Sequence, residues 1–308
     1  MIDRFIAYIE SERRLSPLTV RNYRRDITAF ADWFNKRTAL DTFDATKVEA
    51  QDISDYMIYR LDTSKISAAS MNRELSSLKS LFGYLHRVGV VDKSLTSRIS
   101  SLKTPKVLPV FVSESRIAEL VEDTRQKSYS AVFKEQQQSI IITLFYGCGI
   151  RLAELQAIKL CDISPNAIKI SGKGDKQRLV PLVPEVAARI TRYLECCQTN
   201  GINIGSQDSL IVGTKGRPLS RITIQRTVAK AMGEAAIQGR KSPHILRHTF
   251  ATHLLNKGVD MRQIQELMGH ASLQTTQHYT HNSITKLMEV YAKAHPHSEG
   301  TGEGDKDD

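Results

Sequence analysis

The stretch "EQQQSIIITLFYGCGIRLAELQAI", residues 135–158, decides the fold of the second half of this chain. Its first part is strongly apolar, and its second part repeats apolar residues at helical spacing. Gly147 and Gly149 stand between the two parts, and glycine allows backbone conformations that end a helix. We therefore predict an apolar helix, a sharp break and a new helix that begins near Arg151.

Arg151 lies near the start of the second predicted helix, and Glu154 follows one turn later. A guanidinium in that position can bind a phosphate group through two parallel hydrogen bonds, and the carboxylate can hold the guanidinium in place. The alternative is an ordinary surface ion pair between residues three apart, which contributes little. This motif alone leaves both interpretations open.

A further helix with functional side chains is predicted at "SPHILRHTFATHLL", residues 242–255. Ser242 and Pro243 are typical of a helix start. His244 and Arg247 lie three residues apart, so they share one face of the first turns, where a helix N-terminus favours an anion. An imidazole and a guanidinium beside one anion indicate a site for phosphate chemistry.

The same segment raises the question of a metal site, because His244, His248 and His253 are close in sequence. His244 and His253 are poorly phased for one set of ligands. The segment has no HExxH motif and no nearby carboxylate or cysteine. We therefore expect no metal, and we assign His248 and His253 to packing or to a polar network.

A β-hairpin is predicted at "AIKISGKGDKQRLVPL", residues 167–182. Residues 167–170 and 178–182 form its arms, and residues 172–176 form its turn. Glycines on both sides leave the ammonium group of Lys173 free to approach an anion or to donate a proton. The alternative is an ordinary exposed turn.

The stretch "MGHASLQTTQHYTH", residues 268–281, is polar and shows no helical period. His270 follows Gly269, and Tyr279 lies nine residues further on. A tyrosine most often belongs to a core, where it would lie on an apolar stripe. The polar surroundings of Tyr279 favour a chemical role instead.

Together these motifs supply two arginines, two histidines, a lysine and a tyrosine. Two guanidiniums can stabilise a phosphodiester as it becomes a pentacoordinate dianion. A tyrosine oxygen can attack phosphorus and form an ester, and a lysine can protonate the leaving oxygen. Because fixed cations neutralise the developing charge and the covalent bond retains the phosphodiester energy, we expect no metal, nucleotide or other cofactor.

The first part of the chain, residues 1–100, is predicted to be helical, with helices across 15–36, 51–61 and 67–89. Ser16 is a candidate N-cap for the first of these. Polar and basic residues follow the faces opposite the apolar stripes of the first and third helices, which suits close approach to a phosphate backbone or a plain solvated face. They are Arg21, Arg24, Arg25, Asn72, Arg73, Ser76 and Lys79.

The composition of the 308-residue chain, with 25% charged and 41% hydrophobic residues, is typical of a soluble globular protein. A net charge of +10 favours a polyanion such as nucleic acid, or a membrane surface, as the partner. No apolar run is long enough for a membrane span, and the N-terminus does not have the pattern of a secretory signal. None of the four cysteines makes a CxxC pair, so reduced thiols and a cytoplasmic location are expected.

The predicted domain organisation has four parts. Residues 1–100 form a helical domain, and residues 101–110 form a basic, proline-containing linker. Residues 111–295 form a mixed domain that carries the candidate chemistry. The acidic, glycine-rich residues 296–308 are expected to be a disordered tail.

Six motifs occur in order along nearly the whole chain: "LSPLTVRNYRRDI", "SMNRELSSLKSLFGYL", "GIRLAELQAIK", "SGKGDKQRLVPL", "PHILRHTFATHLL" and "LMGHASLQTTQHYTH". With them the sequence resembles the tyrosine recombinase (integrase) family, and within it the Xer recombinases. The resemblance implies a mainly α fold with a small β-sheet. It also implies a two-domain, C-shaped DNA clamp, in which a SAM-like core-binding domain is joined to a tyrosine recombinase catalytic domain.

The resemblance further implies catalytic roles for the residues that match the family motifs. Tyr279 would be the nucleophile that forms a 3′-phosphotyrosine link, and Lys173 the general acid for the 5′ oxygen. His244 would bind the phosphate and accept a proton, and His270 would donate a further hydrogen bond to the phosphate.

Arg151 and Arg247 would bind the scissile phosphate. Glu154 would hold Arg151 in position without contacting the phosphate itself. These roles again involve no metal.

The partners implied by the resemblance are double-stranded DNA with a dif-like site and further recombinase protomers. Four protomers, either all of this protein or some of a sister recombinase, would exchange DNA strands through a Holliday junction. The helix at residues 283–294 of each protomer would dock on a neighbouring protomer. An FtsK-type DNA translocase would be a further partner, the location would be the nucleoid within the cytoplasm, and no membrane would be involved.

The expected function is the resolution of chromosome dimers. The alternatives are an integrase or invertase of a mobile element, a type IB topoisomerase, and a DNA-binding protein without catalysis. The complete set of candidate catalytic residues favours an active recombinase.

Overall fold

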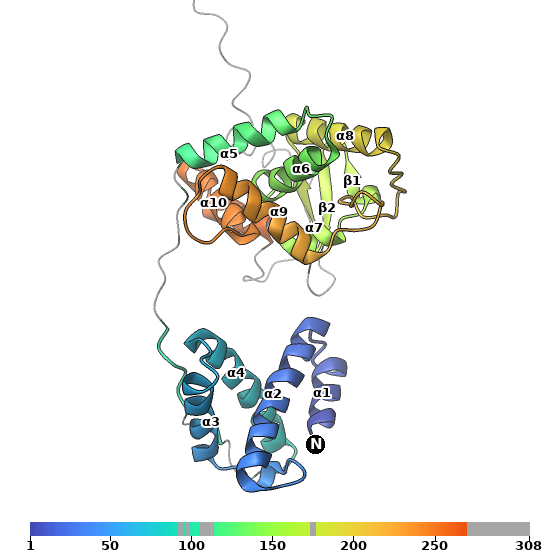
Figure 1. The fold of residues 1–308 in the computed structure, drawn as a ribbon. Coiled ribbons are helices and arrows are strands. Elements are labelled where there is room, and N and C mark those ends of the chain that lie inside the picture. Colours follow the sequence, from blue (N-terminus) through green and yellow to red (C-terminus); the bar gives the residue numbers. More distant parts are fainter. Residues whose placement is uncertain (92–94, 97–98, 105–111, 113, 173–176, 270–308) are drawn as a thin grey trace, which may run out of the picture. The chain divides into compact units, whose positions relative to one another are not determined.

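The computed structural model describes residues 1–91, 95–96, 99–104, 112, 114–172 and 177–269 (Figure 1). The chain divides into two compact units, unit 1 (Met1–Val107) and unit 2 (Leu108–Asp308). Each unit has its own cluster of buried apolar side chains. The predicted helix at residues 283–294 and the predicted tail at residues 296–308 lie outside the described residues.

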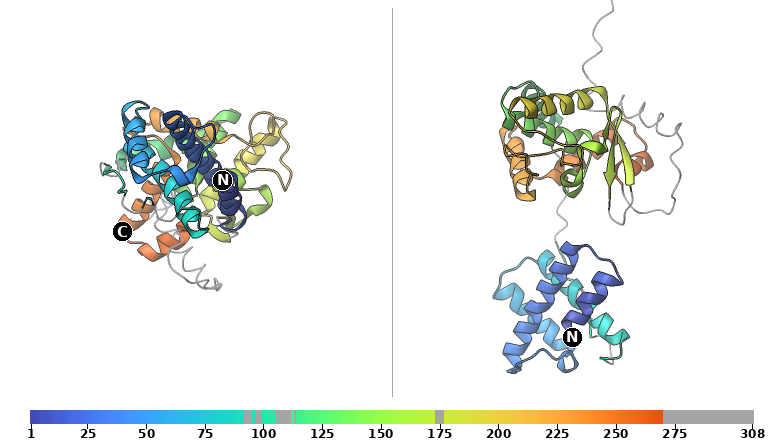
Figure 2. Two further views of the ribbon diagram at one scale, coloured as in Figure 1. Left: turned by 90° about the horizontal axis from the view of Figure 1, so that it is seen from below. Right: turned by 90° about the vertical axis from the view of Figure 1, so that its right-hand side faces the viewer.

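Unit 1 is helical in its described part, as predicted (Figure 2). Ser16 caps the second helix, because its hydroxyl accepts a hydrogen bond from the Thr19 backbone N–H at 3.2 Å. The three helices predicted from periodicity are confirmed, with ends that shift by one or two residues. The helices are α1 (Ile2–Ser11), α2 (Pro17–Thr38), α3 (Ala50–Asp62) and α4 (Ala68–Arg87), with a short 3-10 turn, η1 (Ala45–Lys47).

The apolar stripes of α2 and α4 meet in the core of unit 1. Phe30 lies at its centre, with edge-to-face contacts to Tyr56 of α3 and Phe82 of α4 at centroid distances of 5.2 and 6.3 Å. The predicted α4 stripe is confirmed throughout, because each of its members is at most 1% exposed: Met71, Leu75, Leu78, Phe82 and Leu85.

Unit 1 also contains a buried carboxylate in its core. Asp26 of α2 has a side chain that is 1% exposed, and it accepts hydrogen bonds from Arg73 and Ser77 of α4. Arg25 donates to the same carboxylate at 3.2 Å. A buried charge is tolerated only when it is paired and hydrogen-bonded, so Asp26 ties α2 to α4 at one defined register.

Replacing Asp26 with asparagine should destabilise unit 1 by roughly 2–3 kcal/mol, because charge-assisted hydrogen bonds to a buried group are lost. Urea denaturation of the full chain would measure this loss through the fluorescence of Trp33, the only tryptophan in the sequence.

Asp3 provides the matched control, because its carboxylate pairs with Arg24 at 2.6 Å but is 85% exposed. Asp3→Asn should leave the urea midpoint close to that of the unmodified protein. Equal losses for Asp26→Asn and Asp3→Asn would show that the buried network does not hold α2 to α4.

Unit 2 combines helices with a small antiparallel sheet, as predicted. The predicted hairpin is confirmed, and Ile168 pairs with Val180 in its register. A short strand not predicted from the sequence, β1, extends the sheet to the order β1-β2-β3 (Figure 2). The strands are β1 (Ile163–Ser164), β2 (Ala167–Ser171) and β3 (Gln177–Pro181).

The helix of unit 2 that begins at Arg221 ends at Glu234, because Ala236 has a positive φ of 50° that no helix accommodates. The helices are α5 (Glu114–Lys127), α6 (Phe133–Gly147), α7 (Leu152–Ala157), α8 (Pro184–Thr199), α9 (Arg221–Glu234), α10 (Pro243–Asn256) and α11 (Met261–Met268), with a 3-10 turn, η2 (Leu160–Asp162).

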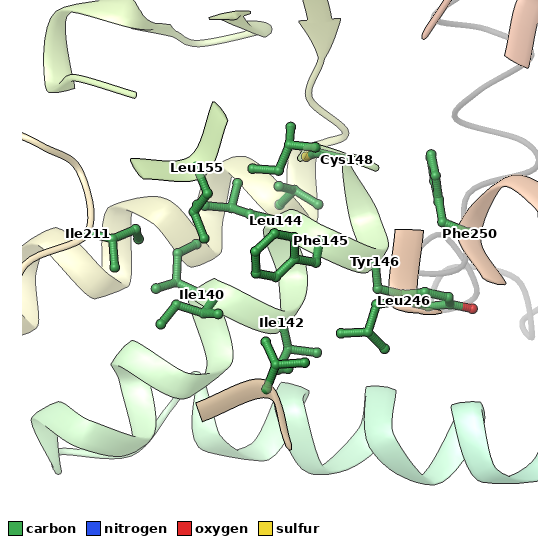
Figure 3. Close-up of a cluster of buried hydrophobic side chains, with 14 of the residues drawn as sticks. Ile140, Ile142, Leu144, Phe145, Tyr146, Cys148, Leu155, Ile211, Leu246 and Phe250 are labelled. Atoms are coloured by element: carbon green, nitrogen blue, oxygen red, sulfur yellow. The ribbon is translucent and has the colours of Figure 1, made fainter. Parts of the chain in front are cut away.

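The apolar helix predicted from residues 135–158 is α6, and it is the core of unit 2. Each residue from Gln136 to Gly147 is buried, and α5, α8, α9 and α10 pack around it. Figure 3 shows Phe145 among Leu144, Leu155 and Leu246 in this core. A helix that is apolar on all sides must be covered on all sides, which explains why unit 2 is assembled around this element.

The polar start of α6 is also buried, and its side chains bind neighbouring segments. Gln136 donates to the Ser128 carbonyl at 2.8 Å, Gln137 to the Val212 carbonyl at 2.5 Å, and Ser139 to the Thr124 carbonyl at 2.7 Å. Buried amides and hydroxyls are tolerated where each finds a partner. The glutamine run therefore attaches distant loops to the central helix.

No helix in the described part of the chain is both long enough and apolar enough to cross a membrane. None of the four cysteines, all of which lie in the described part of the chain, forms a disulfide. Cys148, Cys196 and Cys197 are buried, and Cys161 is exposed.

Candidate active site

The candidate site begins at the glycine break after α6. Gly149 has a positive φ of 59°, and a Cβ atom there would lie 2.6 Å from the ring of Phe250. Only glycine meets both constraints. The break therefore turns the chain sharply against α10 and places Arg151 at the N-cap of α7.

Arg151 and Glu154 are paired as predicted, but not on the surface. The Glu154 carboxylate is 5% exposed, and its Oε1 accepts from Arg151 Nη1 at 2.8 Å. Its Oε2 accepts from the Arg151 backbone N–H at 2.7 Å. The alternative of an ordinary surface ion pair is therefore wrong. Glu154 is buried and accepts hydrogen bonds from both the side chain and the backbone of Arg151.

Arg178 is a residue of this site that the sequence reasoning missed. It projects from β3 and donates to both oxygens of Glu154, from Nη1 at 2.8 Å and from Nη2 at 2.9 Å. Its side chain is only 9% exposed. The sequence did contain a signal for Arg178. Residues two apart on a strand point to the same face, so Arg178 lies on the core-facing side of β3 together with Val180.

Arg247 of α10 completes the cluster. Its side chain is 7% exposed and its Nη1 lies 3.9 Å from Glu154 Oε2. It donates to the carbonyls of Gly149 and Met268. His244 lies three residues earlier on α10 and is exposed. The structure therefore brings Arg151, Arg178 and Arg247 around one carboxylate, and these four side chains are called the Glu154 cluster below.

The three arginines also bind three consecutive backbone carbonyls at the end of α11. Arg178 Nε donates to the Leu267 carbonyl at 3.0 Å, and Arg151 Nη2 donates to the Gly269 carbonyl at 2.8 Å. Arg247 donates to the carbonyl between them, on Met268. The last carbonyls of a helix have no hydrogen-bond partner within the helix, and the C-terminus of a helix attracts cations. The three arginines therefore hold the chain in place where it leaves α11.

The electrostatics of the cluster follow from its burial. Burial raises the pKa of Glu154, but hydrogen bonds from Arg178 and from the Arg151 backbone outweigh it and lower the pKa to about 2. Burial, together with repulsion from Arg151, lowers the pKa of Arg247 to about 10. Both groups are therefore charged at neutral pH, and the cluster holds more positive charge than its carboxylate neutralises.

Acidification should weaken unit 2 through Glu154. The pKa of this carboxyl group falls from 4.5 to about 2 on folding, so its stabilising effect is complete above pH 4.5 and is lost as pH falls toward 2. The shift corresponds to about 3 kcal/mol. Denaturant melts by far-UV circular dichroism between pH 7 and pH 2.5 would measure it.

Glu154→Gln removes the titrating group, so its free energy of unfolding should be lower at pH 7 and should change less over the same pH range. Parallel pH curves for Glu154→Gln and the unmodified protein would contradict this assignment.

Three predicted catalytic residues, Lys173, His270 and Tyr279, lie outside the described residues. The chain enters and leaves the Lys173 turn through Ser171 of β2 and Gln177 of β3, and it reaches His270 directly after Gly269. The catalytic roles of all the candidate residues remain predictions.

The other histidines of α10 have different positions. His253 shares a 2.7 Å hydrogen bond with the hydroxyl of Tyr146, which confirms its prediction as part of a polar network. His248 is exposed. Among the residues that the structure describes, no three His, Cys, Asp or Glu side chains gather as metal ligands would.

The predicted DNA-binding residues of unit 1 fall into two groups. Arg21 and Ser76 are exposed on α2 and α4, and Lys79 is half-buried. Ser76 donates to the Asn72 carbonyl at 2.9 Å, and the remaining residues also have partners within unit 1. Arg24 pairs with Asp3, and both Arg25 and Arg73 pair with Asp26.

Asn72 has a structural task that the sequence did not indicate. Its amide donates to the Leu102 carbonyl at 2.9 Å and accepts from the Leu102 N–H at 2.8 Å. Asn72 therefore holds the segment that follows α4, whereas the sequence pattern predicts a phosphate contact or a solvated face for it. Its partner lies 30 residues away, so the sequence pattern of α4 could not reveal it.

Comparison with known families matches both units. Residues 2–89 match the model "Phage integrase, N-terminal SAM-like domain", and residues 111–286 match the model "Phage integrase family". The two matches cover most of the described part of each unit.

Curated relatives agree over nearly the full length. The chain is 34% identical to the tyrosine recombinase XerC of Pelotomaculum thermopropionicum, over 97% of this chain and 99% of the relative. It is 32% identical to the XerC of Chlorobaculum parvum, over 96% of this chain and 94% of the relative.

Solved structures with similar folds include the XerH site-specific recombinase bound to palindromic difH substrate in a post-cleavage complex. That structure has a TM-score of 0.68 at 21% identity and covers 95% of this chain and 84% of its own. A lambda integrase (75–356) dimer bound to a core site has a TM-score of 0.63 at 18% identity and covers 100% and 97%. These likenesses confirm the predicted fold class. The chain belongs to the phage integrase family, the tyrosine recombinases, and is a DNA strand-exchange enzyme.

Proposed function

We propose that this protein is a Xer-type site-specific recombinase that resolves chromosome dimers at a dif-like site. The observation that carries the proposal is the binding of three arginines to three consecutive carbonyls at the end of α11. The candidate residues His270 and Tyr279 follow this point in the sequence. Relatives named XerC, at 32–34% identity over nearly the full chain, support the chromosomal role.

In the proposed reaction the Tyr279 oxygen attacks the scissile phosphorus. The bond between phosphorus and the 5′ oxygen breaks, and the protein becomes joined to the 3′ end as a phosphotyrosine ester. Lys173 donates the proton that the leaving 5′ oxygen needs. The 5′-hydroxyl of a partner strand then reverses these steps and restores a phosphodiester bond.

The arginines supply the electrostatic part of this mechanism. Arg151 and Arg247 bind the non-bridging oxygens and stabilise the dianion that forms at phosphorus. Each is held by backbone or carboxylate groups before DNA arrives, so little reorganisation is needed in the transition state. His244 and His270 assist with hydrogen bonds and proton movement. Because fixed guanidiniums provide the positive charge, the proposed cleavage needs no metal or nucleotide.

The proposed assembly is based on similar structures. One contains XerH bound to difH substrate, and another contains a lambda integrase tetramer bound to a Holliday junction. We extend both to this chain. Four protomers, alone or with a sister recombinase, clamp two dif-like sites, and a DNA translocase of the FtsK type activates exchange. Arg21 and Lys79 of unit 1 contact the DNA backbone.

Tyr279→Phe should abolish covalent capture of DNA and leave DNA affinity near normal, because only the attacking oxygen is lost. The measurement is adduct formation on a nicked suicide substrate with a candidate dif-like sequence, in EDTA, with the adduct mapped by mass spectrometry. Covalent adducts formed by Tyr279→Phe would disprove Tyr279 as the nucleophile. Tight specific binding without any adduct from the unmodified protein would instead point to a missing partner or a non-catalytic DNA-binding protein.

Lys79→Ala should reduce the slope of log K against log salt concentration by about 1, because one phosphate contact and its released counterion are lost. Fluorescence anisotropy at several salt concentrations would measure this slope. Lys134→Ala, at an exposed position on α6, is the control and should leave the slope unchanged. An unchanged slope for Lys79→Ala would show that Lys79 does not contact phosphate and lies on a solvated face.

Arg73→Ala is expected to combine two effects. It should lower the salt slope if the guanidinium also reaches phosphate, and it should destabilise unit 1 because buried Asp26 loses one of its charged partners. Measuring the urea midpoint beside the salt slope would separate the two effects.

A further inference from the structure

Arg178 has no role in the reaction as described above, yet it makes the most side-chain hydrogen bonds with Glu154. It donates to both oxygens of that carboxylate, whereas Arg151 reaches one oxygen with its side chain. Arg247 remains 3.9 Å from the nearer oxygen. The carboxylate is therefore matched mainly to Arg178, from β3.

This matching has an electrostatic consequence. The four side chains of the Glu154 cluster, three guanidiniums and one carboxylate, carry a net charge of +2. Without Arg178 the net charge would be +1, because Glu154 would neutralise one of the two guanidiniums assigned to the scissile phosphate. The pentacoordinate transition state of phosphoryl transfer from a diester is a dianion, which a charge of +2 matches.

We propose that Arg178 is a positioning residue that takes up the charge of Glu154, so that Glu154 can orient Arg151 without cancelling its attraction for phosphate. The inference rests on the proposed function of Arg151 and Arg247. It explains why a carboxylate is tolerated in a site built to bind an anion. It also explains why the third arginine is buried rather than presented to substrate.

Geometry distinguishes this role from direct catalysis. Within the described part of the chain, Arg178 donates hydrogen bonds to Glu154 and to the Leu267 carbonyl, and its side chain is 9% exposed. Arg151 is 36% exposed and can reach a ligand. Arg178 thus acts through Glu154 and Arg151 and does not touch DNA.

The test compares Arg178→Met with the double variant Arg178→Met plus Glu154→Gln. Methionine keeps an unbranched stem of similar length but removes the charge, which leaves +1 in the cluster. The double variant restores +2 but regains none of the lost contacts with Glu154. The readout is the single-turnover rate of adduct formation on the suicide substrate at saturating DNA, with thermal melting recorded for each protein.

Arg178→Met should cleave roughly 10²-fold more slowly, the order of magnitude expected for one lost charge-stabilising group. The double variant should recover at least tenfold of that loss, although its melting temperature is no higher. Arg178→Lys, which keeps the charge, should cleave faster than Arg178→Met. A double variant as slow as or slower than Arg178→Met would overturn the inference, because Arg178 would then serve only to join β3 to α7.

Arg189 and Glu185 provide a matched control within unit 2. Arg189 is 1% exposed and donates to Glu185 at 2.9 Å, but neither residue contacts the Glu154 cluster in the described structure. Arg189→Met should lower the melting temperature and leave the cleavage rate at saturating DNA unchanged. A loss of rate in Arg189→Met as large as that in Arg178→Met would show that the assay reports stability alone, and would overturn the inference.

A second readout does not depend on cleavage. Orthovanadate, a mimic of pentacoordinate phosphorus, should raise the melting temperature of the unmodified protein. The increase should be smaller for Arg178→Met, and it should be larger again for the double variant. If the unmodified protein forms no adduct, either a partner is missing or the proposed cleavage does not occur, while the vanadate series still decides the charge argument. Equal vanadate shifts in all three proteins would refute the role of Arg178.

Discussion

The candidate site of this recombinase depends on one buried carboxylate. Glu154 is 5% exposed and lies among Arg151, Arg178 and Arg247. An isolated buried carboxylate would be neutral, but the hydrogen bonds from Arg178 and Arg151 keep the pKa of this one near 2. In return the carboxylate holds guanidiniums that would otherwise repel one another. Arg151 lies at the N-cap of α7, Arg178 in β3 and Arg247 in α10, so the contacts of one carboxylate connect three elements of unit 2.

The same arginines connect the site to the chain that follows α11. Three consecutive carbonyls, from Leu267 to Gly269, accept their hydrogen bonds. The left-handed conformation of Gly269, with φ of 64°, ends the helix at that point. The groups proposed to bind phosphate and the backbone that leads to the proposed nucleophile are therefore fixed by the same contacts.

Buried charge organises both units, with different consequences. In unit 1, Asp26 binds Arg73 and Arg25 and sets the register of α2 against α4. In unit 2, the core helix α6 sets the packing, and the Glu154 cluster lies at the break that follows it. A buried ion pair replaced by apolar residues often costs little stability, so its presence at this break is better explained by orientation and charge than by stability.

The sequence by itself determined the helices, the hairpin, the break after α6 and the pairing of Arg151 with Glu154. Apolar periodicity, capping residues and glycines act over a few residues, so they can be read locally. It also indicated His244 and Arg247 on one face of α10, and its motifs placed the chain in its family. Only the tertiary structure decided that Glu154 is buried, that Arg178 shares it, and that Asn72 binds Leu102 rather than standing free for phosphate. These contacts join residues 24 and 30 positions apart, and no local pattern encodes which distant group a long polar side chain will reach.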